Sequence, residues 1–97
     1  MVVGLLQLEI FIPGAKSLKD KRQVVKSIIG KIESKYNVSV SEVDHQDLWQ
    51  RASIGVAHTS ETGAQTRKLL ENVRAFVESL NKATVTRADI SIFAPEK

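Results

Sequence analysis

Apolar residues along the chain recur with two periods, and each period indicates one kind of secondary structure. The segment 2–12 is mostly apolar, with Gln7 and Glu9 alternating with apolar residues at its centre, and it predicts a strand that Pro13-Gly14 ends as a turn. From 16 to 36 the apolar residues instead follow helical spacing. The expected inner face of the strand is formed by Leu6, Leu8, Ile10 and Ile12. The expected apolar stripe of the helix is formed by Leu18, Val25, Ile28, Ile29, Ile32 and Tyr36.

The second half of the chain repeats these two patterns. Alternation at 38–43 and again at 50–59 predicts two strands, helical spacing predicts a helix up to about Leu80, and 84–94 reads as a last strand. Capping signals agree with the two helices. These signals are Ser17 with Asp20, and Thr62 with Gln65 or alternatively Ser60, while Asn37 is the expected left-handed residue after the first helix.

The order strand, helix, strand, strand, helix, strand predicts an α+β fold. With right-handed crossovers it is the ferredoxin-like βαββαβ arrangement, a four-stranded antiparallel sheet with two helices on one face. We expect a single domain over 1–97, with the third strand between the first two. The start of the first helix and the 44–49 connection should therefore meet at one edge, so that the helix start faces the 44–51 segment.

The composition narrows the class of protein. An apolar content of 42% and a charged content of 26% are typical of soluble domains. No cysteine is present, which excludes disulfides and thiolate chemistry. No apolar run approaches the roughly 20 residues of a membrane span, and the first residues do not resemble a signal peptide. A cytoplasmic location without a membrane partner is therefore expected.

Positive charge is concentrated at the start of the first helix. The net charge is +3, but the segment from Lys16 to Lys26 carries +4, so the rest of the chain carries −1. Cations at a helix N-terminus oppose the helix dipole by a few tenths of a kcal/mol each. They are therefore expected either to be neutralised by acids or to hold an anion. The five cations of the segment are Lys16, Lys19, Lys21, Arg22 and Lys26, and the first four are those expected near the positive end of the dipole.

Helical geometry divides these cations into two sets. Lys21 falls on the apolar stripe and Arg22 at its margin, whereas Lys19 and Lys26 point outward and, with Lys16, form the outward set. All five are candidate phosphate contacts of RNA. For the outward set the alternative is a solvated surface. For Lys21 and Arg22 the alternative is an ion pair with Glu42, Asp44 or Asp47.

Aromatic residues suggest a second binding surface. Trp49 and Arg51 are expected at the rim of the open sheet face, flanking the basic helix start. Trp49 either stacks on a base, fills a subunit interface or packs under the 44–48 connection. The residues 51–59 lack the Gly-aromatic run of an RNA-recognition motif, so base stacking on that strand is disfavoured. The candidate interface residues are Leu5, Phe11, Trp49 and Phe93.

Catalytic chemistry finds little support in the residues. His45 reads as a solvated loop residue, although it could titrate or bind a metal, and His58 as a half-buried residue near a strand end. No Ser–His–Asp arrangement can be argued. The acids at 42, 44 and 47 are better explained by ion pairs than by acid–base catalysis. We therefore expect no enzyme activity, metal, cofactor or small-molecule substrate.

Two segments resemble a known family. VVGLLQLEIFIPGAKSLKDKRQVVKSI and NVSVSEVDHQDLWQRASIGVA are similar to the YlxP-like proteins, a family of small bacterial domains of unknown function. The resemblance implies a ferredoxin-like fold, a bacterial cytoplasmic protein, and genes often near those of translation initiation and ribosome maturation. It supplies no catalytic residue. The first hypothesis is thus a non-catalytic module that contacts RNA or a ribosomal particle, and the alternative is a homo-oligomeric or protein-docking domain.

Overall fold

The computed structural model describes residues 1–95 and contains the predicted elements in the predicted order. Each boundary lies within two residues of the expected one, so the βαββαβ prediction is confirmed. The elements are β1 (Val2–Phe11), α1 (Leu18–Lys35), β2 (Ser39–Asp44), β3 (Arg51–Ser60), α2 (Gly63–Ser79) and β4 (Thr84–Phe93).

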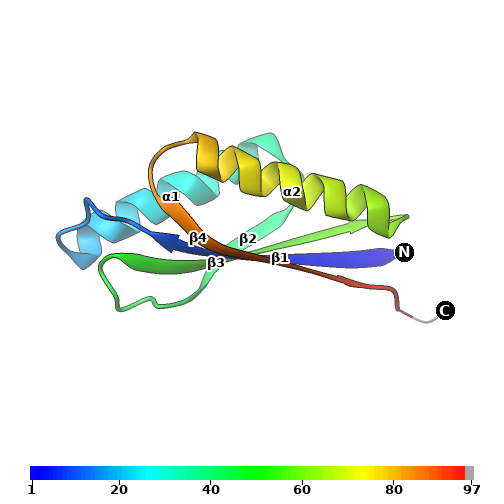
Figure 1. Ribbon diagram of the computed structural model, residues 1–97, viewed down its shortest axis with the longest axis horizontal. Helices are drawn as coiled ribbons and strands as arrows, with labels where there is room; N and C mark the ends of the chain where they lie inside the picture. The colour runs from blue at the N-terminus through cyan, green and yellow to red at the C-terminus, as the bar shows by residue number, and fades with distance from the viewer. Residues whose placement is uncertain (96–97) are drawn as a thin grey trace.

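The four strands form one antiparallel sheet in the order β2-β3-β1-β4. β3 therefore separates β1 from β2, as the topology predicted. Figure 1 shows both helices on one face of this elongated sheet, while the β2–β3 connection extends to the other side. The sheet thus has one covered face and one open face. No helix in the part of the chain that the structure describes is long and apolar enough to cross a membrane.

The core lies between the covered face and the two helices. Leu8 of β1, Ile28 of α1 and Leu70 of α2 are fully buried there. Burying an aliphatic side chain of this size stabilises the fold by about 1.5–3 kcal/mol. The predicted inner residues of β1 are confirmed, and they pack with Ile32, Ile54, Val56, Val73 and Val77.

Both helices begin at the predicted caps. Ser17 has an extended backbone and its hydroxyl accepts a hydrogen bond from the Asp20 backbone N–H at 3.1 Å. The Asp20 carboxylate in turn accepts from the Lys16 backbone N–H at 3.1 Å, so the first turn of α1 holds a reciprocal cap. Thr62 accepts in the same way from the Gln65 backbone N–H at 3.2 Å.

One backbone prediction is wrong. α1 ends at Tyr36 in an extended conformation, with φ −126° and ψ 146°, and Asn37 is not left-handed. The chain leaves the helix in this extended conformation and continues directly toward β2. Among residues 1–95, the non-glycine residues with positive φ are His45 at 61° and Asn81 at 54°. Asn81 follows α2, where such a residue commonly ends a helix.

Candidate functional site

Lys21 is the one cation of the helix start that lies inside the protein. Its side chain is 0% exposed, and its Nζ lies 2.7 Å from Oε2 of Glu42 on β2. The same ammonium group donates a hydrogen bond of 2.6 Å to the His45 carbonyl oxygen. Burial of a lysine requires such partners, because an unpaired charge away from water is strongly disfavoured. The ion-pair alternative is therefore confirmed for Lys21, and its prediction as a phosphate contact is wrong.

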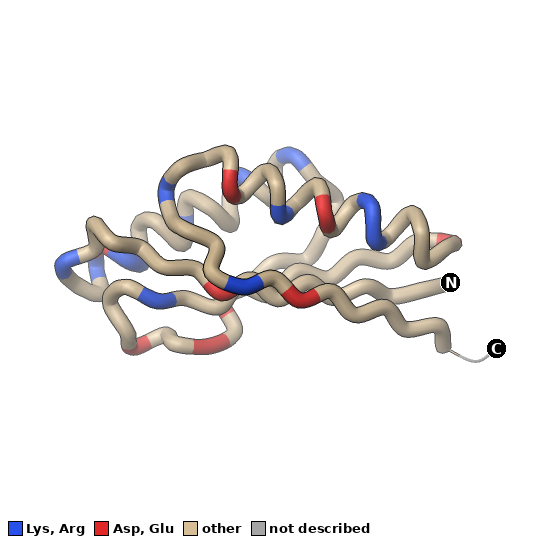
Figure 2. Tube along the Cα trace, in the orientation of Figure 1, with Lys and Arg blue, Asp and Glu red and all other residues tan. Residues whose placement is uncertain are grey.

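The remaining four cations of the helix start are exposed. Lys16, Lys19, Arg22 and Lys26 all face solvent, and no acid of residues 1–95 comes within ion-pairing distance of them. The predicted internal ion pair of Arg22 is therefore wrong within that range. Figure 2 shows Lys and Arg residues grouped at the end of the molecule where β1 passes into α1. The charge of this end is thus available to an outside partner.

Trp49 and Arg51 lie on the other side of the sheet from the helices. Arg51 faces Phe11 across the β1–β3 ladder, which places it on the open face. Trp49 shares a surface recess with both residues and is 56% exposed, so it does not pack under the 44–48 connection. The prediction that the whole 44–51 segment faces the helix start is therefore only partly correct. Lys21 reaches the backbone of His45, whereas Arg51 points away from α1.

The open face carries most of the large apolar side chains that remain exposed. The predicted interface residues Leu5, Phe11, Trp49 and Phe93 are all exposed. Sequence reasoning missed Val43 and Leu48, which are exposed on the same side. Val43 covers Gly55 of β3. Alternation along β2 could have placed Val43 on the open face, because Val40, three residues earlier on the same strand, faces inward. An apolar surface of this kind is typical of a contact site.

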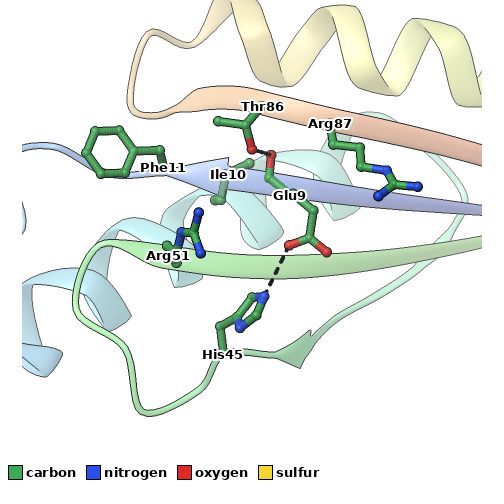
Figure 3. Close-up of a pocket in the computed structure, with 7 residues that line it drawn as sticks. All are labelled: Glu9, Ile10, Phe11, His45, Arg51, Thr86 and Arg87. Carbon is green, nitrogen blue, oxygen red and sulfur yellow. Dashed lines mark hydrogen bonds and ion pairs between the residues drawn. The ribbon is translucent and has the colours of Figure 1, made fainter.

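A polar hollow of about 400 Å³ opens on the same face (Figure 3). Its centre is Glu9, whose Oε1 accepts hydrogen bonds from Ser53 Oγ at 3.1 Å and Gln7 Nε2 at 3.2 Å. Ser53 is fully buried although it belongs to the open face. The hollow is lined by Glu9, Ile10, Phe11, His45, Arg51, Thr86 and Arg87.

His45 is held against this hollow and is not the solvated residue that the sequence suggested. Its side chain is 32% exposed, and Nε2 lies 3.5 Å from Oε2 of Glu9. Its backbone is left-handed, its N–H donates to Asp44 Oδ1 at 2.8 Å, and its carbonyl oxygen accepts from Lys21. The sequence carried no signal for this, because a left-handed histidine follows from the tertiary contacts of the connection.

His58 takes part in a separate polar cluster under α2. Its Nδ1 lies 3.2 Å from Oγ1 of the buried Thr66, and the Ser60 hydroxyl lies 2.6 Å from the same oxygen. This half-buried position agrees with the prediction. Within residues 1–95, no three His, Cys, Asp or Glu side chains gather as a metal site would require.

Together these features define a small ferredoxin-like α+β domain with a basic helix start and an uncovered sheet face. The chain belongs to the family of proteins of unknown function DUF503, whose model matches residues 3–90. It is 42% identical over 90 residues to the uncharacterized protein YlxP of Bacillus subtilis (strain 168), covering 91% of this chain and 98% of that protein. The family resemblance read from the sequence is thereby confirmed.

A solved structure supports the fold alone. The de novo designed protein Foldit4 matches with a TM-score of 0.50 and 12% sequence identity, covering 98% of each chain. At that identity the likeness concerns the arrangement of helices and strands and carries no information about a site.

Proposed function

We propose that this domain is a non-catalytic binding module that contacts RNA, free or within a ribosomal particle, through the start of α1. The observation that supports the proposal is the exposure and the lack of ion pairing of four cations, both judged within residues 1–95. Lys16, Lys19, Arg22 and Lys26 are exposed and have no acidic partner within residues 1–95, and the helix dipole additionally disfavours a cation in the first turn, where Lys19 lies.

Phosphate groups of a nucleic acid are suitable partners for these four exposed cations. Each lysine that neutralises a phosphate releases a counterion, which favours binding at low salt. The guanidinium of Arg22 offers paired donors for one phosphate. The exposed indole of Trp49 is a second proposed contact, because an aromatic ring can stack on an unpaired base. With few such contacts, we expect a dissociation constant in the micromolar range or weaker.

The proposal also assigns a role to Lys21 and a location. Lys21 makes no contact with RNA but ties α1 to Glu42 and so fixes the direction in which its exposed neighbours project. We propose that the protein acts in the cytoplasm, where RNA is found. The chain has no cysteine, so its stability does not depend on disulfides that the reducing conditions there would break.

Charge reversal tests the proposal. Lys16, Lys19 and Lys26 are replaced together by Glu, and sedimentation of the protein with RNA or ribosomes is compared at low salt. The matched control reverses three exposed lysines elsewhere, Lys31, Lys68 and Lys82. We expect the first variant to lose association and the control, with the same net charge, to keep most of it. Equal association of both folded variants would remove the proposal.

A second candidate function is self-association through the open face. Among residues 1–95, six of the seven large apolar residues that are exposed lie on this face or in the connection beside it: Leu5, Phe11, Val43, Leu48, Trp49 and Phe93. From strand spacing and rise, a sheet of three ten-residue strands and one six-residue strand covers roughly 600 Å². That is close to the roughly 800 Å² that each partner contributes to a standard interface. A second copy of this chain is the proposed occupant, because two copies can pack the same apolar face against each other about a two-fold axis.

A further inference from the structure

We propose that the hollow on the open face binds a small organic anion that also carries a hydroxyl or amino group. The hollow measures about 400 Å³, which lies within the usual range of ligand sites. It combines a fixed carboxylate, an imidazole, two guanidinium groups and an aromatic ring. The hollow adjoins the proposed RNA contact only through Trp49, which shares a recess with Phe11 and Arg51, and the inference does not depend on RNA binding.

The Glu9 carboxylate, which lines the hollow, is held in place by two neighbours. Ser53 and Gln7 both donate to Oε1 of Glu9, and Gln7 also donates to Ser53 Oγ at 2.9 Å. The Glu9 side chain is 27% exposed, so only a small part of it can be reached by solvent or a ligand. Oε2 is left facing the hollow and His45. A carboxylate oxygen held in this way accepts a hydrogen bond from an incoming hydroxyl or amine at little cost in lost freedom.

His45 is fixed from behind by the protein interior. The buried Lys21 ammonium binds its carbonyl oxygen at 2.6 Å, and Asp44 binds its backbone N–H. A left-handed backbone in a non-glycine residue costs free energy, and such strain gathers where the surrounding structure holds a site. The Lys21–Glu42 pair therefore supports the imidazole that faces Glu9.

The sheet is also irregular at this place. The β1–β4 register shifts between Glu9 and Ile10, so that Thr86 has no partner in the ladder. Thr86 instead donates through its hydroxyl to the Glu9 carbonyl oxygen at 3.1 Å. Bulges of this kind re-aim side chains and are frequent beside functional sites. Here the extra residue lines the hollow next to Arg87.

The rim of the hollow is basic. Arg51 of β3 and Arg87 of β4 lie on opposite sides of Glu9 (Figure 3). Arg87 pairs with Asp89 at 2.8 Å, while Arg51 has no acid within ion-pairing distance in residues 1–95. A phosphate or carboxylate group suits the guanidinium rim, and Glu9 between the arginines selects anions that also bring a donor.

Together these features define the chemical groups that the ligand must carry. Its anionic group binds Arg51, its hydroxyl or amino donor binds Oε2 of Glu9, and its apolar part lies against Phe11. The sequence predicted no small-molecule ligand, because neither the left-handed His45 nor the bulge at Thr86 is visible in the residue pattern. Ribose 5-phosphate is a suitable probe, and sulfate is the matched anion that has no donor.

The experiment is a residue-resolved NMR titration of the full chain with each probe. We expect ribose 5-phosphate to shift signals around Glu9, His45 and Arg51 with a dissociation constant of about 1 mM or lower, given the usual efficiency of small ligands. Arg51→Gln should weaken both probes about tenfold, which is the effect of one lost charge-assisted hydrogen bond. Arg87→Gln repeats the test should Arg51→Gln fail to fold.

Glu9→Gln gives the sharper result. It should weaken ribose 5-phosphate, because a strong acceptor is lost, and strengthen sulfate, because a repelling charge is lost. A merely structural glutamate would move both affinities in the same direction. Lys26→Gln on α1 is the control and should change neither. Absence of saturable shifts at the hollow, shifts that map to the start of α1, or equal changes of both probes in Glu9→Gln would overturn the inference.

Discussion

The Lys21 ammonium group lies 2.7 Å from the Glu42 carboxylate, with the lysine fully buried and the glutamate side chain 17% exposed. This pair joins the first turn of α1 to β2, and through the His45 carbonyl oxygen it also joins the β2–β3 connection. One buried charge thereby orients both surfaces described above, the basic helix start and the hollow of the open face.

Loss of one partner of this pair should be costly. In Lys21→Met the Glu42 carboxylate would stay largely buried without its counter-charge. We expect the free energy of unfolding to fall by about 3 kcal/mol. Urea denaturation measures this, with the exposed Lys19→Met as the control that changes stability by less than about 0.5 kcal/mol.

Removing both charges should restore most of the stability. The double variant Lys21→Met, Glu42→Leu removes both charges of this pair, and such replacements are often neutral or stabilising. A single variant as stable as the unaltered chain would mean that water or another cation reaches Glu42, and would contradict the account of this pair.

Two glycines should respond oppositely to alanine. A Cβ at Gly4 would lie 2.0 Å from Thr66 Cγ2 and 2.9 Å from Leu70 Cδ1, so β1 and α2 would have to separate. We expect Gly4→Ala to destabilise the fold by about 1–3 kcal/mol. Gly30 lies within α1, and apart from the helix's own backbone no heavy atom of residues 1–95 comes within 4 Å of its added Cβ. Gly30→Ala should therefore stabilise the fold by about 1 kcal/mol. Thermal unfolding of both variants checks the sign of each change.

Self-association should depend on the apolar residues of the open face. Trp49→Glu or Phe93→Glu should lower the mass seen by sedimentation equilibrium at high concentration, because a charge would be buried between two copies. Gln23→Glu on α1 is the control, since Gln23 is an exposed polar residue on the helical side of the sheet, away from the open face. A chain that is monomeric at every concentration would rule out the second candidate function.

The fold was predictable because its signals are local. Alternation in β1, helical spacing in α1 and α2, and the caps Ser17 and Thr62 each act within a few residues. The order of elements then leaves one well-known topology. The Asn37 prediction failed because the residue that ends a helix depends on where the next strand lies, and here α1 leaves directly toward β2.

The candidate sites were predictable only in part. Helical phase correctly separated Lys21 from the outward lysines, and it misplaced Arg22 because a residue at the margin of the stripe can turn either way. The hollow at Glu9 was invisible, since it joins β1, β3, β4 and the β2–β3 connection through a register shift and a left-handed residue. Such features follow from packing between distant segments.

The salt dependence of RNA binding tests the central claim most directly, because it counts the cations that contact phosphate. The logarithm of the association constant for a single-stranded RNA is measured against the logarithm of salt concentration. Replacing Lys16, Lys19 and Lys26 by Gln should reduce the steepness of that line by about 2, at roughly 0.7 per phosphate contact on a single strand. Lines of equal slope for the unaltered chain and this variant would contradict the claim that the exposed start of α1 binds a polyanion.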